Sequence, residues 1–354
     1  MQKSALGLFF SFLLAVFLSS HALAADDAVA EPVVKKHHSR KAHHKARQVA
    51  AIRQERIVKR VVFLHGKRRT VYRHVSYARA IPSNVDGMGE FDASQGPLAL
   101  KSNVAYIMDS SSSDVLFEKN ADNALPIASI TKLMTALVVV ESNQDMNEVL
   151  EVTKDDIDHI KNTSSRLRVG ARLTRSNMLH IALMSSENRA ASALGRNYPG
   201  GLPAFVAAMN AKAKELGMSN THYVDSNGLS SENVASARDL AKLIQAAQRY
   251  PVLCEYSTDQ QYVVEPGGRA LHYRNSNHLV NNPTWDIMLQ KTGYIVEAGR
   301  CLVMQARIEG RPIIMVLLDS KTKESRLADA GRVRKWVETV KFDKLANPVQ
   351  AAQS

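Results

Sequence analysis

Cysteine is almost absent from this chain, whose 354 residues contain only Cys254 and Cys301. Two thiols cannot form the dense disulfide framework of a small secreted scaffold, and a chain of this length can bury a core without one. Cys301 lies in an apolar run, RCLVMQA, which is typical of a buried free thiol. The sequence leaves open whether the two thiols pair.

Long apolar runs are missing beyond the first 24 residues, so no later segment is predicted to span a membrane. The one such run, residues 5–18, follows Lys3 and precedes Ala22-Leu23-Ala24. It is shorter than the roughly 18 residues of a spanning helix and ends at small residues, which favours a cleaved signal peptide over a retained anchor. No cysteine near the cleavage point could carry a lipid. We therefore expect a signal peptide over residues 1–24 and a soluble, exported protein.

Acidic residues are scarce between Pro32 and Ala80, where Glu55 is the single acid among fifteen Lys and Arg. That stretch carries +14, against a net charge of +12 for the whole chain. Its segment VKKHHSRKAHHKARQ has no apolar periodicity, which is typical of a solvated chain. We expect residues 25–97 to form a basic, largely disordered arm and linker. Its expected partner is an anionic cell wall or membrane surface rather than nucleic acid.

Metal-binding patterns are missing too. The histidine pairs 37/38 and 43/44 have no nearby carboxylate or cysteine that would complete a site. A protonatable arm explains these histidines better than a metal site does. We therefore predict neither a metal nor another cofactor.

Apolar periodicity predicts the fold of the remaining chain. A short hairpin is indicated around His65-Gly66, and a second one is formed by NVAYIMD and VLFEKN. A helical middle follows, with SITKLMTALVVVE, SNMLHIALM and LPAFVAAMNAKAKELG, the last ending at Gly217. Three strands, WDIMLQKTGY, RCLVMQARIE and RPIIMVLLDS, precede a helix over about residues 324–340. This order indicates an α+β domain with one antiparallel sheet covered by helices.

A serine and a lysine that could react together occur at the start of the first predicted helix, in Ser129-Ile130-Thr131-Lys132. Positions three apart lie on one helical face, so the amine can reach the hydroxyl. A hydroxyl becomes a good nucleophile when a base takes its proton, and a lysine of lowered pKa can be that base. The pattern alone is weak, because Ser320-Lys321-Thr322-Lys323 also matches it; we interpret that copy as a strand end with solvated lysines.

The tetrapeptide SSEN occurs twice, at residues 185–188 and 230–233. The second copy follows the turn DSNG and precedes a helix that Ser236 opens, with Asp239 three residues on in a capping-box pattern, so a loop explains it. The first interrupts an apolar helical stretch, where polar side chains need partners. Ser186 and Asn188 could find those partners in the serine and lysine above and in a substrate amide.

The third element, Lys291-Thr292-Gly293, occurs once and lies in the strand WDIMLQKTGY. The lysine and threonine suit the binding of a carboxylate, and the glycine lets a substrate backbone approach the strand edge. S-x-x-K, S-x-N and K-T-G follow one another at separations of 57 and 105 residues. This order is the signature of penicillin-binding proteins and class A β-lactamases.

The chain accordingly resembles the low-molecular-mass penicillin-binding proteins, the D-Ala-D-Ala carboxypeptidase and endopeptidase family of serine peptidases. The resemblance runs from about residue 103 to 340 through PIASITKLMTA, MSSENRAA, VDSNGLSSENVASARDL, LHYRNSN and LQKTGYIVEAGRCLVM. It implies a β-lactamase/transpeptidase-like fold, with a five-stranded antiparallel sheet flanked by helices and a helical subdomain. We place this peptidase domain at residues 98–345 and a tail at 346–354.

The resemblance also implies roles for the motif residues around the reacting bond. Ser129 would be the acylated nucleophile and Lys132 its general base. Ser186 would relay a proton to the leaving amine, and Asn188 would hold a substrate backbone amide.

Further roles implied by the resemblance lie on the K-T-G strand. Lys291 and Thr292, followed by Gly293, would bind a carboxylate, and the backbone N–H groups of Ser129 and Tyr294 would hold the oxyanion. We expect Lys291 to stay charged and its ammonium to lower the pKa of the neighbouring lysine base.

Peptidoglycan stem peptides and cross-links are the substrates that the resemblance implies, in the periplasm, with β-lactams as covalent inhibitors.

The motifs do not separate an endopeptidase from a carboxypeptidase, since both leaving groups carry a carboxylate. The wider resemblance, and the lack of a second β domain and of an amphipathic C-terminal anchor, favour the endopeptidase. A β-lactamase is disfavoured because no E-x-x-L-N loop is present. A non-catalytic wall-binding protein is the other alternative.

Overall fold

The structure is a computed structural model that describes residues 53–64, 67–78 and 98–346. These residues belong to two units, divided after Gly89. The predicted signal peptide, the histidine pairs and residues 347–354 of the predicted tail lie outside the described residues. The domain boundaries expected at residues 24, 97 and 345 stay predictions. No helix within the described ranges is long and apolar enough to cross a membrane.

The first unit contains two antiparallel strands, β1 (Arg53–Leu64) and β2 (Lys67–Ala78). Their register is continuous over 12 residues in each strand. The strands flank residues 65–66, so the hairpin expected at this position is present. The disorder expected elsewhere in the arm concerns residues outside the described ones.

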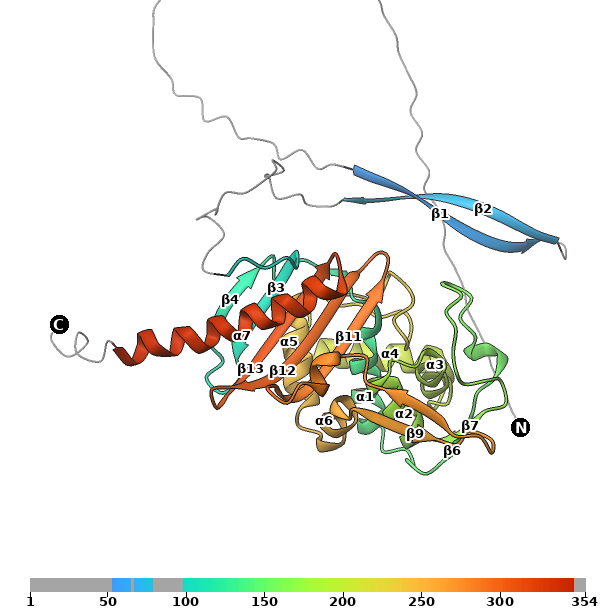
Figure 1. Ribbon diagram of the computed structural model, residues 1–354. Helices are drawn as coiled ribbons and strands as arrows, with labels where there is room; N and C mark the ends of the chain where they lie inside the picture. Colours follow the sequence, from blue (N-terminus) through green and yellow to red (C-terminus); the bar gives the residue numbers. More distant parts are fainter. Residues whose placement is uncertain (1–52, 65–66, 79–97, 347–354) are drawn as a thin grey trace, which may run out of the picture. The chain divides into compact units, whose positions relative to one another are not determined.

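The second unit is built on an antiparallel sheet of five strands in the order β11-β12-β13-β3-β4 (Figure 1). Because β13 pairs with β3, segments about 200 residues apart in the chain lie side by side, with Leu318 opposite Val104. Strands β11 and β4 form the two edges of the sheet. The strands are β3 (Val104–Asp109), β4 (Val115–Lys119), β11 (Asp286–Ile295), β12 (Gly299–Ile308) and β13 (Arg311–Ser320).

Helices cover the sheet and form a layer of their own. Helix α1 is buried from Thr131 to Val139 and runs through the middle of the helical layer, because its sequence is apolar apart from Thr131, Lys132 and Thr135 within this span. The helices expected at SITKLMTALVVVE, SNMLHIALM and LPAFVAAMNAKAKELG are α1, α2 and α4. The α-helices of the described residues are α1 (Thr131–Glu141), α2 (Arg175–Met184), α3 (Asn188–Arg196), α4 (Gly201–Glu215), α5 (Ala237–Ala247), α6 (Pro251–Thr258) and α7 (Lys323–Ala346).

Short ladders and 3₁₀ turns tie the helical layer together, and the sequence analysis does not predict them. The ladder between β5 and β8 pairs Leu125 and Pro126, which precede Ser129, with the two residues that follow the second SSEN copy. The short strands and 3₁₀ turns are β5 (Leu125–Pro126), β6 (Val149–Glu151), β7 (Arg172–Thr174), β8 (Val234–Ala235), β9 (Gln261–Val264), β10 (Leu271–Arg274), η2 (Ala128–Ile130), η3 (Lys154–Asp156) and η4 (His278–Asn281).

Both faces of the sheet are buried, so the fold has two apolar cores. Ile107 and Met315 point to one face and pack with Val333 of α7, which Figure 1 shows crossing that face. Tyr106 and Val316 point to the other face and join the core of the helical layer. Because side chains alternate along a strand, neighbouring residues such as Tyr106 and Ile107 enter different cores. The predicted α+β sandwich of sheet and helices is confirmed.

The start of α5 corrects one detail of the sequence analysis. The Ser236 hydroxyl accepts a hydrogen bond from the Asp239 backbone N–H at 3.2 Å, as the capping pattern predicts. The Asp239 carboxylate, however, accepts from the Asn220 N–H at 2.7 Å and pairs with Lys242 at 2.9 Å. It therefore fixes the loop after α4 instead of completing a capping box.

Gly228 lies where two backbone segments meet. Its φ is +78°, and a Cβ atom at this position would lie 2.1 Å from the carbonyl oxygen of Ala128. That distance is far below van der Waals contact, so only glycine fits without a backbone shift. The turn that carries Gly228 is thus packed directly against the segment that contains Ser129.

Replacing Gly228 with alanine should lower the free energy of unfolding by about 2–5 kcal/mol, because left-handed backbone costs about 1–2 kcal/mol and overpacking about 1–3 kcal/mol. Urea denaturation followed by circular dichroism measures the loss. Gly170→Ala is the matched control, since Gly170 has φ +88° but no heavy atom within 4 Å of its added Cβ. It should lose only the backbone contribution, and equal losses in both variants would contradict the role assigned to close packing.

Candidate active site

The turn that carries Ser129 is fixed on both sides. Ser129 lies in η2, directly after Ala128, whose φ of +50° is unusual for a residue with a side chain. The Ile127 N–H donates to the Asn233 carbonyl at 3.1 Å, and Gly228 packs against the Ala128 carbonyl. Left-handed backbone at a non-glycine residue persists only where the surroundings hold it. The surroundings here therefore determine where the Ser129 hydroxyl points.

The Lys132 amine is buried at the centre of the motif residues. The residue is 1% exposed, and its Nζ lies 2.9 Å from Ser129 Oγ, 2.8 Å from Asn188 Oδ1 and 2.6 Å from the Asn227 carbonyl oxygen. A neutral amine has two N–H groups and one lone pair. The two carbonyl oxygens can only accept, so they take the two N–H groups and the lone pair is left facing the Ser129 hydroxyl. This geometry is the one that a general base requires.

Burial favours the neutral form of this amine. It lowers the pKa of Lys132 to about 7, although the negative charges of Asp225 and Glu187 act to raise it. The ammonium of Lys291, which is expected to help lower this pKa, is not among its causes; instead, the charge of Lys132 acts to lower the pKa of Lys291. Desolvation is the cause, and a large share of Lys132 is neutral at neutral pH.

The first SSEN copy forms the turn between α2 and α3, next to Lys132. Ser186 has a φ of +64°, Glu187 caps α3 by accepting from the Arg189 N–H, and Asn188 is the first residue of the helix. Of the two polar side chains expected to find partners here, Asn188 contacts Lys132 as predicted. The Ser186 hydroxyl has no hydrogen bond to Ser129 or Lys132 in the described structure, so its role in proton transfer stays a prediction.

The second SSEN copy is a loop, as expected, and it also supports the nucleophile's turn. The Asn233 side chain accepts from the N–H groups of Val224 and Asp225 at 2.8 and 3.3 Å. The Asn233 carbonyl accepts from Ile127, two residues before Ser129. One SSEN copy therefore contacts the lysine, and the other holds the backbone that carries the serine.

The K-T-G residues lie on β11, an edge strand, so the sheet leaves one side of their backbone unpaired. Lys291 is fully buried and donates to the Thr292 carbonyl at 2.9 Å, and the Thr292 hydroxyl lies 2.8 Å from that of Ser276. Burial, with the positive charges of Lys132 and Arg326, holds the pKa of Lys291 well below its usual value. The lowered pKa opposes the expected positive charge of Lys291, and that charge stays a prediction. A bound carboxylate would raise that pKa again.

Gly293 is needed for a reason that the sequence does not reveal. A Cβ atom at this position would lie 2.7 Å from the Ile127 carbonyl oxygen, so the strand can approach η2 only with a glycine there. Tyr294, the next residue, is 48% exposed, and the Arg300 guanidinium stacks 3.5 Å from its ring centroid. The close packing of β11 on η2 brings K-T-G and Ser129 together.

Sequence reasoning missed three groups at this site. The Asn227 carbonyl binds Lys132, and Asp225 holds the turn by accepting from the N–H groups of Asn227 and Gly228. The sequence predicts the turn DSNG, but nothing in it indicates that this turn borders Lys132. Arg326 is buried on α7, donates to the Cys301 carbonyl at 3.0 Å and has an unpartnered Nε. The sequence does not indicate that Arg326 lies near the K-T-G residues, because this proximity arises only when α7 packs on the sheet.

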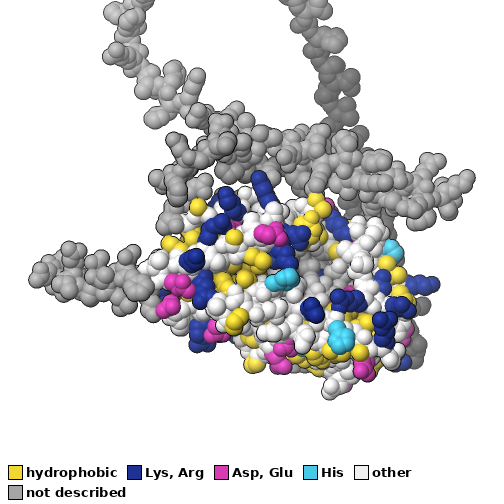
Figure 2. Space-filling model, viewed as in Figure 1, with side chains coloured by type: hydrophobic (Ala, Val, Ile, Leu, Met, Phe, Trp, Pro, Cys, Tyr) yellow, Lys and Arg dark blue, Asp and Glu magenta, His cyan; other side chains and the backbone are white. Residues whose placement is uncertain are grey.

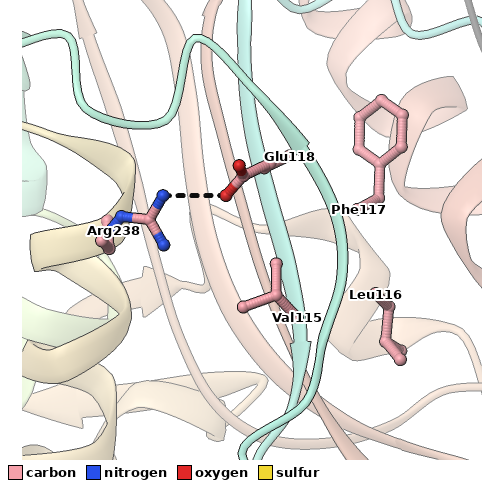
Figure 3. A pocket seen from close by; sticks show the side chains of 5 residues that line it. All are labelled: Val115, Leu116, Phe117, Glu118 and Arg238. Carbon is pink, nitrogen blue, oxygen red and sulfur yellow. Dashed lines mark hydrogen bonds and ion pairs between the residues drawn. The ribbon is translucent and has the colours of Figure 1, made fainter.

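Other features of the described residues lie apart from the site. Both cysteines are free, and no cluster of three His, Cys, Asp or Glu residues could hold a metal ion. The open hollow in Figure 3, of about 490 Å³, lies along β4, the sheet edge opposite β11, where Glu118 points toward Arg238. It contains none of the motif residues; its lining is Val115, Leu116, Phe117, Glu118 and Arg238.

Comparison with known proteins agrees with this geometry. Residues 91–322 match the peptidase S11 family, described as D-alanyl-D-alanine carboxypeptidase. A D-alanyl-D-alanine endopeptidase of Pseudomonas aeruginosa is 49% identical, over 68% of this chain and 78% of that protein. One of Escherichia coli is 44% identical, over 73% and 83%. The D-alanyl-D-alanine carboxypeptidase DacF of Bacillus subtilis is 29% identical, over 67% and 62%.

Solved structures show the same fold. The Streptomyces K15 DD-transpeptidase superposes with a TM-score of 0.64 at 27% identity, over 67% of this chain and 97% of that one. Penicillin-binding protein D2 of Listeria monocytogenes, in its ampicillin-bound form, gives 0.60 at 28% identity, over 68% and 98%. Fold and site thus define a serine hydrolase with the penicillin-binding, DD-transpeptidase fold. The chain belongs to the D-alanyl-D-alanine carboxypeptidase family, peptidase S11.

Acylation by a fluorescent penicillin should become faster as the pH rises and level off above a midpoint at about pH 7, the pKa of Lys132. Only the neutral amine can take the Ser129 proton, and each pH unit below the midpoint leaves about tenfold less of it. Stopped-flow fluorescence measures the rate across this range. A midpoint near the ordinary lysine value, or a flat profile, would contradict the assignment of Lys132 as the base.

Proposed function

We propose that this protein is a D-alanyl-D-alanine endopeptidase that hydrolyses peptidoglycan cross-links through an acyl-enzyme on Ser129. The observation that carries the proposal is the buried Lys132 amine, which faces the Ser129 hydroxyl with both of its N–H groups engaged elsewhere. A lysine held in this way can activate a serine hydroxyl for acyl transfer.

Acylation begins when Ser129 Oγ attacks the carbonyl carbon of the scissile D,D-peptide bond and Lys132 Nζ takes the hydroxyl proton. The resulting oxyanion is held by the backbone N–H groups of Ser129 and Tyr294, which the packing of β11 on η2 supports. Fixed donors of this kind lower the barrier by several kcal/mol. Asn188 holds the substrate's backbone amide through the part of its side chain that does not face Lys132.

The tetrahedral intermediate then breaks its C–N bond. The leaving amine takes a proton that starts on Lys132 and passes through the Ser186 hydroxyl, so the lysine returns to its neutral form. In the second half of the cycle, water attacks the ester carbonyl carbon while Lys132 Nζ takes one of its protons. The C–Oγ bond then breaks and Lys132 returns that proton to Ser129 Oγ, which regenerates the serine and the neutral lysine and releases the carboxylic acid product. Atoms and charges balance without a metal or redox cofactor.

The carboxylate beside the scissile bond binds at Lys291 and Thr292. Burial holds the pKa of Lys291 low, and an arriving carboxylate acts to raise it, so the bound anion favours the charged form of this lysine. Arg326 adds a second buried cation close enough to affect Lys291. The substrate carboxylate beside the cleaved bond is thus attracted by positive charge on Lys291 of β11 and on Arg326 of α7.

The choice of the endopeptidase over the carboxypeptidase rests on similarity. The relatives named as endopeptidases are 49% and 44% identical to this chain, and the carboxypeptidase DacF is 29% identical. The carboxypeptidase remains the second candidate, because its substrate presents the same carboxylate beside the bond. β-Lactams acylate Ser129 and inhibit the enzyme. A non-catalytic wall-binding protein is disfavoured, because the Lys132 amine lies within hydrogen-bonding distance of both Ser129 and Asn188.

The basic arm, residues 25–97, attaches the mature enzyme to an anionic cell wall or membrane surface in the periplasm. The support is the charge distribution: the arm holds the cationic excess of the chain. The cations of the described domain are spread over the face shown in Figure 2, and many pair with acids, as Arg196 does with Asp156 at 2.9 Å. A concentrated positive segment is attracted to polyanions in a salt-dependent way.

A digest of purified muropeptides tests the proposed activity. Residues 25–354 should convert the D,D-cross-linked dimer into monomers, and Ser129→Ala should yield none, because it lacks the nucleophile. Chromatography with mass spectrometry identifies the products. Removal of only the terminal D-Ala from pentapeptide would assign the carboxypeptidase, and absence of both products would favour the wall-binding alternative.

Deletion of residues 25–97 should leave the turnover of soluble muropeptides intact but weaken binding to sacculi at low salt, since the arm supplies the charge. Co-sedimentation of both chains with sacculi across a salt series measures the difference. Equal sedimentation at low salt would show that the arm does not attach the enzyme to the wall.

A further inference from the structure

The loop between η3 and β7 contacts the site without contributing to any of the three motifs. Its first half is organised by Asp158, whose carboxylate accepts from the N–H groups of Ile160, Lys161 and Thr163 at 2.8, 2.9 and 2.8 Å. Burial alone would raise the pKa of Asp158, but the hydrogen bonds from Lys161 and Thr163 outweigh burial and lower that pKa. The carboxylate is therefore ionised at neutral pH and can only accept.

This ionised carboxylate determines the direction of two further hydrogen bonds. The Thr163 hydroxyl lies 2.8 Å from Asp158 Oδ2, so it must donate its proton there. Its lone pairs are then free to accept from Asn188 Nδ2 at 3.0 Å. With its NH₂ group facing Thr163, Asn188 must present Oδ1 to Lys132, as observed at 2.8 Å. A chain of hydrogen bonds thus runs from Asp158 through Thr163 and Asn188 to Lys132.

The orientation of the Asn188 amide matters for the lysine. Asn188 Oδ1 accepts a hydrogen bond from one of the two N–H groups of the neutral Lys132 amine. The lone pair of the amine is then left for the Ser129 hydroxyl. A flipped amide would present NH₂ to Lys132, and this donor would compete with the Ser129 hydroxyl for the lone pair. The flipped amide would also stabilise the ammonium form less well, because a donor would replace an acceptor beside it.

The loop is held in place by contacts that do not involve Thr163. Lys161 pairs with Glu297, in the turn after β11, at 2.6 Å, and both side chains are mostly buried. Ser165 donates to the Glu187 carboxylate at 2.6 Å. The backbone N–H groups that bind Asp158 are unaffected by a change of the Thr163 side chain. A substitution there consequently changes one hydroxyl and leaves the loop anchored.

We propose that Thr163 is a positioning residue for acylation: its hydroxyl fixes the Asn188 amide with Oδ1 toward Lys132, and so keeps the lysine lone pair directed at Ser129. The inference rests on the proposed roles of Lys132 and Asn188. It adds a residue outside the three motifs to the groups that prepare the nucleophile.

The test compares Thr163→Val with Thr163→Ser in the full mature chain. Valine keeps the shape, removes the hydroxyl and places a methyl group where water could otherwise replace it, whereas serine keeps the hydroxyl. The measurement is the pH profile of acylation by a fluorescent penicillin, with thermal melting as the check on folding. The plateau rate of Thr163→Val should fall by about tenfold or more. A factor of this size corresponds to the free energy of one hydrogen bond to a charged or polarised partner. The pH midpoint of Thr163→Val should move below that of the wild type, and Thr163→Ser should match the wild type in both.

Three outcomes bear on the proposal in different ways. A wild-type plateau and midpoint in Thr163→Val would overturn it. Equal losses in Thr163→Val and Thr163→Ser would also overturn it, since they would assign the effect to packing. The wild-type chain is acylated in the same experiment, so a failure of the proposed acyl-enzyme chemistry on Ser129 shows as no acylation at all and is distinguished from a failure of this inference.

Discussion

The burial of one amine, that of Lys132, is the constraint on which the rest of the site depends. Transferring an ammonium from water to the interior costs several kcal/mol. The protein avoids much of that cost by keeping a large share of the Lys132 amine in its neutral form. Its three partners come from three separate segments: η2, the α2–α3 turn and the turn that precedes the second SSEN copy. The helical layer can close around the amine only if all three segments reach it.

The same constraint explains the unusual backbone around Ser129. Left-handed conformations at Ala128 and Ser186 each cost about 1–2 kcal/mol relative to ordinary backbone. Both residues border polar groups of the site, and both are held by regular structure on either side. Stability gained in the two apolar cores offsets this strain, so that a hydroxyl and an amine are held at hydrogen-bonding distance before any substrate arrives.

Much of this arrangement can be predicted from the sequence. Strand alternation and turn residues indicated the five strands of the sheet, and the order of S-x-x-K, S-x-N and K-T-G indicated which serine and lysine lie together at the candidate site. Contacts between segments far apart in the chain could not be predicted. The need for Gly293 depends on how closely β11 approaches Ile127, and Arg326 reaches the site only because α7 packs on the sheet. Burial or a neighbouring cation could lower the pKa of Lys132, and only the folded chain shows that burial is the larger cause.

The two free cysteines have a consequence for how the protein is made and handled. Burial raises the pKa of Cys301 to about 12, so only about one thiol in 10⁵ is a reactive thiolate at neutral pH. Cys254 is half-buried, and burial raises its pKa as well. The fold of residues 98–346 therefore does not depend on a disulfide, and a reductant has no such bond to break in this part of the chain.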